Sequence, residues 1–190
     1  NVYGKKKGLE SVHLCIGVEG LKYTDENRYS LLILNSILGN SVSSRLFQEI
    51  REKRGLAYAI FSYAASYRDT GMLTVYAATD SSKVREVIDL ILKEFIIIKK
   101  DIVCKDELRK AKEQLKGNLI LSLESTINKM TQIGRQEIYF SRNFTIEEIL
   151  HNIDAVTSEQ VQRIAHSLFR KDSIALTTLG PVTIKEIPAL

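Results

Sequence analysis

The sequence predicts an α+β fold, in which helices pack on one face of a largely antiparallel sheet. Three observations support this prediction. A two-armed run of strand-like residues, 57–79, folds back on itself at Arg68-Asp69-Thr70-Gly71, several helical patterns follow it, and further strand-like runs stand before and after this block. Strands paired through a hairpin, with helices gathered elsewhere along the chain, are typical of this layered class.

The 190 residues are predicted to form a single domain, 1–190. Hydrophobic residues make up 44% of the chain and charged residues 26%, which is ordinary globular composition with enough apolar surface for a core. No repeat, low-complexity tract or Pro/Gly linker divides the sequence. The chain starts at Asn1 without an initiator methionine, which is compatible with a fragment of a longer protein, and a targeting peptide upstream would not be visible.

A strand and a helix are predicted before residue 41. Ser11–Glu19 alternates, and both of its faces are largely apolar, which predicts a strand covered on both sides or nearly so. Thr24-Asp25-Glu26 supplies an N-cap and an acidic first turn for the following helix, and Gly39-Asn40 ends that helix. The basic triplet Lys5-Lys6-Lys7 ahead of the strand is interpreted as a solvated terminal arm.

A second, charged helix is predicted to run directly into the hairpin. Ser41 or Ser43 is expected to cap it, and Gly55 stands at the C′ position, where glycine commonly ends helices. The residues expected on its inner face are Val42, Leu46, Phe47 and Ile50. The two arms of the hairpin are predicted at 57–67 and 72–79.

Helices dominate the rest of the chain. One is predicted over about 82–100, capped by Asp80-Ser81-Ser82, and another from about Lys105 to Leu123. These two are expected to pack side by side on the sheet. Shorter helices are predicted at about 125–141, 145–153 and 158–169, the last capped by Thr157 or Ser158, and a final strand at Ile174–Leu179 ends at Gly180-Pro181.

Composition argues against several classes of partner. The net charge is +4, but acidic residues are interspersed nearly everywhere and there is no long basic block, so no nucleic-acid partner is expected. No apolar run reaches the length of a membrane span. Cys15 and Cys104 lie far apart without a C-x-x-C pair, which predicts reduced, mostly buried thiols and a cytoplasmic compartment, with one disulfide left open.

Motifs for metal and nucleophilic chemistry are missing. Neither H-x-x-E-H nor H-E-x-x-H includes His13, His151 or His166, and no G-x-S-x-G or phosphate-binding loop occurs. Glu10/His13 and Glu148/His151 are Glu-x-x-His pairs, but the first lies on a predicted strand, where residues three apart point to opposite faces. We therefore predict no metal site in this chain, and expect His13 within the sheet and the other histidines on helix surfaces. A Ser/His/Asp triad stays open, because its members need not be adjacent in sequence.

The junction between the charged helix and the hairpin holds the most informative polar residues. Arg51 and Arg54 lie in the last turns of the helix, and Tyr58 opens the strand. One interpretation is structural, because cations complement a helix C-terminus and aromatic residues are favoured in strands. The other is functional, because a guanidinium and a phenol at a rigid corner are suited to hold peptide carbonyls.

The segment from Ser43 to Tyr58 resembles the signature of the second, non-zinc half of the pitrilysin-type (M16) metallopeptidases, which include the processing proteases. The most specific part is F-x-x-x-R-x-K-x-x-L-x-Y, Phe47 to Tyr58. Other segments resemble this family in the same order along the chain: His13–Gly17, Asn27–Tyr29 through Leu38-Gly39, Asp69–Gly71, Glu107–Lys112 through Leu121–Ser125, Gly134–Glu137, Val156-Thr157 and Leu179–Pro181. One departure is Gly39-Asn40-Ser41-Val42, which is poorer in glycine than the family's usual run and bears on the geometry of the cleft.

The resemblance implies two homologous halves, in one chain or as separate subunits, that close like a clamshell on a peptide or unfolded segment. The other half would carry the zinc, and this half would contribute Arg51, which binds the substrate main chain, and Tyr58, which hydrogen-bonds the scissile carbonyl or its oxyanion. Both side chains are expected to face one open cavity, with the phenol partly accessible to solvent. This chain alone is expected to be inactive and to bind no zinc; its expected partners are the zinc-carrying half and, as an option, further copies of the same chain.

Two other interpretations remain. The chain would be a non-catalytic structural subunit of the same fold, although members with that role tend to lose the Arg/Tyr pair, or an unrelated α+β binding module whose motifs match by coincidence.

Overall fold

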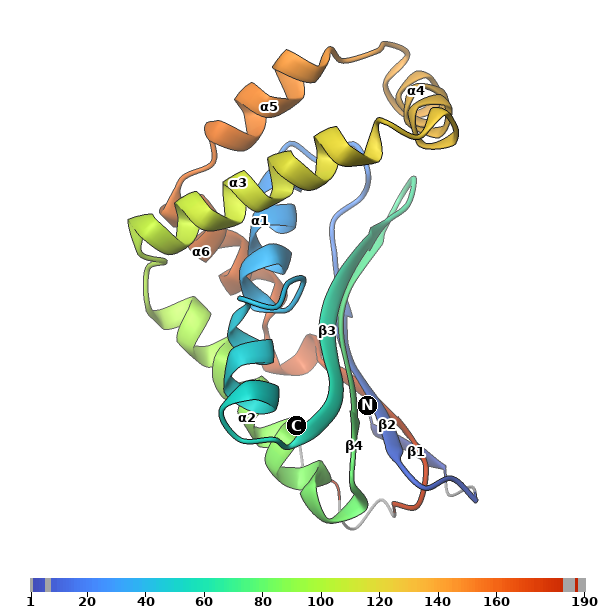
Figure 1. Ribbon diagram of the computed structural model, residues 1–190, viewed down its shortest axis with the longest axis vertical. Helices are drawn as coiled ribbons and strands as arrows, with labels where there is room; N and C mark the ends of the chain where they lie inside the picture. Colours follow the sequence, from blue (N-terminus) through green and yellow to red (C-terminus); the bar gives the residue numbers. More distant parts are fainter. Residues whose placement is uncertain (1, 6–7, 183–186, 188–190) are drawn as a thin grey trace.

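The computed structural model describes residues 2–5, 8–182 and 187. Within them, five strands form one sheet in the order β1-β5-β2-β4-β3, and the helices gather on one side of it (Figure 1). Three of the four neighbouring strand pairs are antiparallel, and β1 and β5 are parallel. The predicted α+β fold, a largely antiparallel sheet with helices on one face, is therefore confirmed.

The strands are β1 (Val2–Lys5), β2 (Val12–Glu19), β3 (Ala57–Ser66), β4 (Gly71–Thr79) and β5 (Ala175–Leu179). The hairpin β3–β4 and the strands β2 and β5 were predicted, whereas the interpretation of the lysine-rich start as a solvated arm is wrong at Lys5, which pairs with Leu179. A four-residue strand is too short to show alternation, and it forms because it satisfies the free edge of β5. Lys6 and Lys7 lie outside the described residues.

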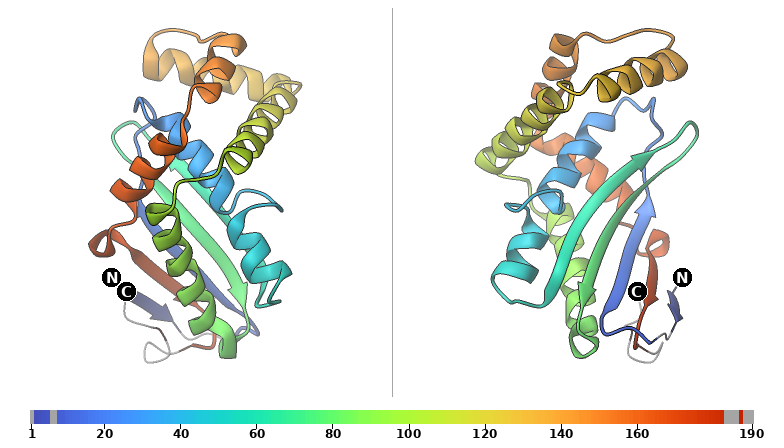
Figure 2. Two further views of the ribbon diagram at one scale, coloured as in Figure 1. Left: turned by 90° about the vertical axis from the view of Figure 1, so that its left-hand side faces the viewer. Right: turned by 45° about the vertical axis from the view of Figure 1, so that its right-hand side comes forward.

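The two faces of β2 differ more than predicted. Val12, Leu14, Ile16 and Val18 are buried beneath the helices. His13, Cys15 and Gly17, on the opposite face, are half-buried, because no helix covers that side of the sheet in the described chain (Figure 2). His13 lies within the sheet as expected, and its Nδ1 is 2.8 Å from the hydroxyl of Tyr76 on β4. We call this uncovered surface the open face.

The helices follow the predicted order closely. Their bounds are α1 (Arg28–Leu38), η1 (Phe47–Glu52), η2 (Ser81–Lys83), α2 (Val84–Lys100), α3 (Lys105–Ser122), α4 (Thr126–Phe140), α5 (Ile146–Asp154), α6 (Ser158–Leu168) and η3 (Lys171–Ser173). α1 starts later than predicted, because the side chain of Asp25 accepts a hydrogen bond from the Asn27 N–H at 2.8 Å and closes a turn ahead of the helix. The predicted cap at Thr157 is present as a full capping box with Gln160.

The expectation that α2 and α3 pack side by side on the sheet is wrong. α2 packs against α6, where the rings of Phe95 and Phe169 stack 4.1 Å apart, and α3 packs against α1 and α5. The link 101–104 turns the chain away from the sheet between the two helices (Figure 1). α4 stands at the outer corner, and Gln136 is its buried residue. The helical layer is therefore close to the sheet around α1, α2 and α6 and open near α4.

Candidate functional site

The segment that carries Arg51 is a π-helix, η1, where an α-helix was predicted. Its backbone hydrogen bonds reach five residues back, as from Lys53 N to Gln48 O at 3.0 Å. Leu46 and Ile50 are fully buried and anchor the segment on the core. π-turns are rare and often lie at functional sites.

Residues 40–43, a short distance ahead of η1, lie at or near the surface. Val42, predicted to face inward, is 71% exposed, and its carbonyl accepts a hydrogen bond from Gln48 Nε2 at 2.7 Å. The hydroxyls of Ser41 and Ser43 contact each other at 3.2 Å, and neither caps the π-helix, so the predicted cap is wrong. In the run Gly39-Asn40-Ser41-Val42, only Gly39 lies so close to other atoms that a larger side chain would not fit.

Arg51 differs from the two basic residues beside it. Glu49 accepts hydrogen bonds from Arg54 Nη2 at 2.8 Å and Lys53 Nζ at 3.1 Å, and these bonds lower the pKa of its carboxyl below the ordinary value. The Arg51 guanidinium instead lies 5.1 Å from the centre of the Phe47 ring. It has no carboxylate within 4.0 Å in the described part of the chain. Its donors are thus available to an acceptor from outside.

The corner between Arg51 and the strand is held by backbone hydrogen bonds. Gly55 adopts φ +58°, which favours glycine, and confirms the predicted C′ position. Its N–H donates to the Arg51 carbonyl at 3.1 Å, and the Leu56 N–H donates to the Ile50 carbonyl at 2.9 Å. The path from the guanidinium-bearing residue to the strand is therefore fixed.

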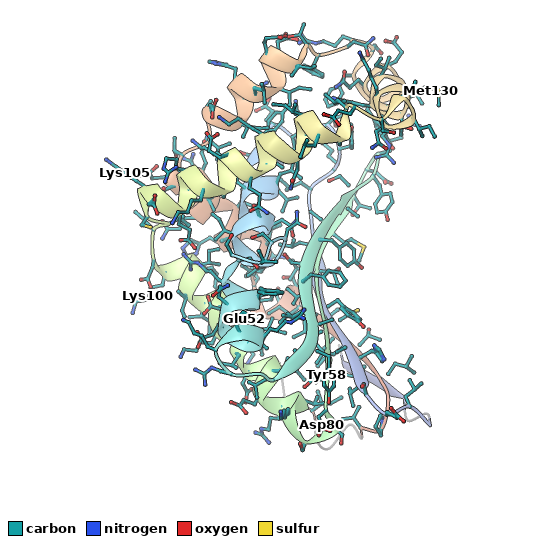
Figure 3. All side chains as sticks on the ribbon, viewed as in Figure 1. Glu52, Tyr58, Asp80, Lys100, Lys105 and Met130 are labelled. Carbon is teal, nitrogen blue, oxygen red and sulfur yellow. The ribbon has the colours of Figure 1, made fainter. Side chains whose placement is uncertain are left out.

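Tyr58 follows this corner at a β-bulge. Ala57 pairs with Thr79 and Ala59 with Ala78, so Tyr58 is the extra residue of β3. Bulges re-aim side chains and are common beside active sites. The Tyr58 side chain is 66% exposed and lies at the end of β3 nearest the corner (Figure 3). The phenol is thus accessible, as predicted, although neither Arg51 nor Tyr58 lines the two cavities described here.

Arg45, in the Ser-Arg-Leu part of the motif, has a structural contact. It forms a two-pronged ion pair with Glu107 of α3, with both N–O distances at 2.7 Å. The hydrogen bonds that Arg45 donates to the Glu107 carboxylate raise the Arg45 pKa above its ordinary value. This pair ties the segment that leads into η1 to the helical layer, and so helps to position Arg51.

A cavity of about 820 Å³, which was not predicted from the sequence, lies at the other end of β3. It lies between the hairpin tip, the start of α1, the end of α3 and α4, and a second, smaller cavity of about 210 Å³ lies between α1 and α3. Arg28 and Arg135 line the larger cavity. The only part of the cavity that the sequence had drawn attention to was Gly134–Glu137, which resembles the M16 family and had been assigned no role. A pocket formed by five separate segments, the fifth being residues 144–149, leaves no local pattern.

Aromatic rings form much of the wall of the larger cavity. Tyr23 lies 4.5 Å from Tyr139 between ring centres, and Arg28 lies over Phe140 at 5.0 Å and Phe144 at 5.6 Å. Burial raises the pKa of Tyr23, while the nearby charges of Arg135 and Arg28 oppose that rise. Both guanidinium groups therefore act electrostatically on this cavity.

The described residues do not fit a metal ion. No three His, Cys, Asp or Glu side chains come together among them in an arrangement that would hold one. Glu148, from one of the Glu-x-x-His pairs, accepts hydrogen bonds from Thr145 N at 2.8 Å and Arg142 Nη2 at 2.7 Å, so it closes a helix cap. Zinc therefore has no donor set in this part of the chain.

The two cysteines are free thiols in different settings. Cys15 is half-buried, and burial raises the pKa of its thiol. Cys104 is exposed at the start of α3, so the expectation that it is buried is wrong. No described helix has the length and apolar character needed to cross a bilayer.

Comparison with known proteins identifies related chains. Residues 1–115 match the family described as the peptidase M16 inactive domain. The chain is 42% identical over 177 residues to the uncharacterized zinc protease YmxG of Bacillus subtilis, covering 93% of this chain and 43% of that protein. It is 38% identical over 181 residues to an uncharacterized zinc protease of Mycobacterium leprae, covering 95% and 40%. The chain thus spans about two fifths of the length of these curated relatives.

Solved structures share the fold. A peptidase M16 inactive domain from Pseudomonas fluorescens superposes with a TM-score of 0.86 at 23% identity, covering 96% of this chain and 44% of that chain. A protease from Helicobacter pylori gives 0.84 at 20% identity, covering 95% and 43%. A chain of complex III2 from Candida albicans gives 0.81 at 20% identity, covering 95% and 45%. At these identities the likeness concerns the fold alone.

Proposed function

Since the chain belongs to the peptidase M16 inactive-domain family, we propose that it is the substrate-binding half of a zinc-dependent endopeptidase that cleaves peptides or unfolded segments. The zinc-carrying half is a second half-domain, on the same polypeptide or on a partner subunit. The relatives named as zinc proteases are more than twice as long as this chain, which leaves room for such a half.

The observation that carries the proposal is the state of Arg51 and Tyr58. Arg51 is exposed and lacks a carboxylate partner in the described chain, although Arg54 and Lys53 beside it share Glu49. Tyr58 is exposed at a bulge, and a hydrogen-bonded corner joins the two residues. Burial of both side chains, with their polar groups satisfied inside the chain, would instead have favoured a purely structural pair.

The two side chains have separate roles in the proposed reaction. The Tyr58 hydroxyl donates a hydrogen bond to the oxygen of the scissile carbonyl. This hydrogen bond becomes stronger as negative charge develops on that oxygen in the transition state. The Arg51 guanidinium donates to main-chain carbonyls of the bound peptide and holds its register. Zinc in the other half supplies the Lewis acid that activates water and polarises the carbonyl.

The open face is proposed to line the chamber between the halves. Phe61 lies 4.9 Å from Tyr76 and 6.3 Å from Tyr63, both measured between ring centres. Phe61 and Tyr63 are each at least 40% exposed on this face. Assembly of further copies and a cytoplasmic location are part of the same proposal, and the free thiols of Cys15 and Cys104 favour a reducing compartment.

The test is proteolysis by the assembled protein with its zinc half. Tyr58→Phe should lower kcat by about 10²–10³-fold with less effect on KM, by analogy with other oxyanion donors. Arg51→Ala should act more on KM, because main-chain contacts form in both ground and transition states. Tyr63→Phe, an exposed tyrosine on the same strand, and Arg54→Ala, which is paired with Glu49, are the matched controls. Equal losses in all four variants would contradict the assignment.

A structural subunit is the second candidate. The fold also occurs in complex III2 of Candida albicans, and the open aromatic face suits permanent contact with another subunit. In that case Phe61→Ser would dissociate the subunits of the assembly, while Tyr58→Phe would leave the assembly and its properties unchanged. Loss of cleavage in Tyr58→Phe with assembly intact would exclude this candidate.

A further inference from the structure

We propose that the cavity at the hairpin tip binds the carboxylate of a peptide whose backbone lies along the free edge of β3. The proposal rests on the peptide-binding role given above and adds a second contact, at the opposite end of β3 from Tyr58. We call this site the tip cavity; its lining comes from residues 23–32, the hairpin tip 64–67, the end of α3, α4 and residues 144–149.

The charge of the tip cavity favours an anion. Its lining includes two guanidinium groups, Arg28 and Arg135, and no carboxylate. Arg28 donates to neutral acceptors, the Asp25 carbonyl at 3.1 Å and the Tyr29 hydroxyl at 3.4 Å. Arg135 makes no hydrogen bond or ion pair with the rest of the described chain, and yet its charge acts on Tyr23. Two cations without a counter-charge make a carboxylate the complementary group.

The rings around the cavity suit an apolar side chain next to that carboxylate. Tyr23 packs against Tyr139 at 4.5 Å and Phe140 at 5.8 Å, and all three are partly exposed to the cavity. Ligand pockets of about 300–1,000 Å³ usually combine such apolar walls with a few polar groups. The volume of about 820 Å³ lies in that range. A small inorganic anion would leave most of this wall unused.

The backbone of β3 provides the reason to expect a peptide. β3 is the last strand of the sheet, and the Ser62 N–H points away from β4 to the Gly39 carbonyl at 3.0 Å. Outward and inward groups alternate along an antiparallel pair, so Ala64 and Ser66 also point outward. Their main-chain groups have no hydrogen-bond partner in the described part of the chain, and both residues line the cavity. An added peptide strand would satisfy them.

Geometry then relates this site to Tyr58. Ala64 is six positions after Tyr58, and a strand rises about 3.4 Å per residue, so the two sites lie roughly 20 Å apart along β3. The bond between Ser62 and Gly39 blocks the edge between them. A substrate would therefore pair with β3 at the tip and leave the edge before it reaches Tyr58.

The test measures equilibrium binding, without zinc or cleavage. The probe is a pentapeptide of four alanines and a carboxyl-terminal phenylalanine, labelled at its amino end and titrated by fluorescence anisotropy. Amidation of its carboxyl end and Arg135→Gln should each weaken binding about tenfold, since both remove one charge-assisted contact. The amidated peptide should then bind the variant no worse than it binds the wild-type chain. A third peptide, amidated but carrying an internal glutamate, distinguishes a terminal from a side-chain carboxylate.

Controls keep the result interpretable. Arg163→Gln removes an exposed guanidinium from α6, outside the cavity, and should leave the affinity unchanged. N-methylation of alternate peptide nitrogens should abolish binding, because it removes the peptide N–H groups that pair with the free edge of β3. Equal affinity of the acid, the glutamate peptide and the plain amide, or no change in Arg135→Gln with its thermal stability retained, would overturn the proposal. Tyr58→Phe should not alter this affinity, so failure of the proposed proteolysis and failure of this site are separate outcomes.

Discussion

Replacement of Gly39 by alanine tests how closely the helical layer approaches β3. Gly39 ends α1 with φ −160°, an extended backbone that any residue adopts, so its conformation alone does not require glycine. The space does. A Cβ at Gly39 would lie 2.6 Å from the Ser62 nitrogen and 2.7 Å from its Oγ. The Ser62 N–H also donates to the Gly39 carbonyl at 3.0 Å, so the added methyl group would push apart two segments that are bonded to each other.

The expected cost comes from two sources. Overpacking of a tight contact usually costs about 1–3 kcal/mol, and a strained or lost backbone hydrogen bond about 0.5–1.5 kcal/mol. Alanine also restricts the unfolded chain, which returns about 0.4–1 kcal/mol. Gly39→Ala should therefore lower the free energy of unfolding by about 2 kcal/mol.

The same substitution elsewhere in the chain provides the control. Gly117 and Gly134 lie inside α3 and α4, and a Cβ at either would have no atom within 4 Å beyond its chain neighbours and the nearby backbone of its own helix. Gly117→Ala should stabilise the protein by about 1 kcal/mol, because alanine is the better helix former. Urea unfolding followed by circular dichroism measures both changes. If Gly39→Ala were as stable as the wild-type protein, the close approach of α1 to β3 would be wrong.

Two further predictions concern charged side chains near η1, Glu94 and the Arg45–Glu107 ion pair. Burial raises the pKa of Glu94, so ionisation of its carboxyl group costs more free energy in the folded chain than in the unfolded chain. This destabilisation of the folded chain is absent below the ordinary carboxyl pKa and complete above the raised pKa of the folded state. Glu94→Gln should therefore raise the urea midpoint at about pH 7 but not at about pH 3, and equal gains at both would contradict the burial. Arg45→Ala should cost about 1–2 kcal/mol, since Arg45 and Glu107 are 20% and 31% exposed. A double-mutant cycle with Glu107→Ala should be non-additive, and strict additivity would show that the pair contributes nothing.

The features that were predicted well from the sequence are those that depend on local patterns of residues. The β3–β4 hairpin, the long helices α2 and α3 and the glycine at position 55 each depend on residues within one or two turns. The accessible Tyr58 was expected from the resemblance to the M16 family, whereas the β-bulge at this residue was not predicted. That Arg51 and Tyr58 face one shared cavity remains a prediction for the assembled protein.

The features that were missed depend on contacts between distant segments. The π-helical turn of η1 follows from the anchors Leu46 and Ile50 on a core that the local pattern does not describe. Cys104 is exposed at the N-cap position of α3, and the neighbouring Val103 is the residue of this link that packs into the core. The tip cavity needs the hairpin, α1, α3 and α4 to meet, and none of these segments alone signals a pocket.

The pairing of β1 with β5 has a consequence for the order of folding. The two strands join residues 2–5 to residues 176–179, the most distant contact of the sheet in sequence. Closing a loop of that length directly is entropically unfavourable, and β1 offers four residues of pairing in return. Once β5 has added to β2, however, β1 is connected to that growing edge by residues 6–11 alone. β1 should therefore dock last and open first, and its amides should exchange with deuterium through a local opening that leaves the other four strands paired.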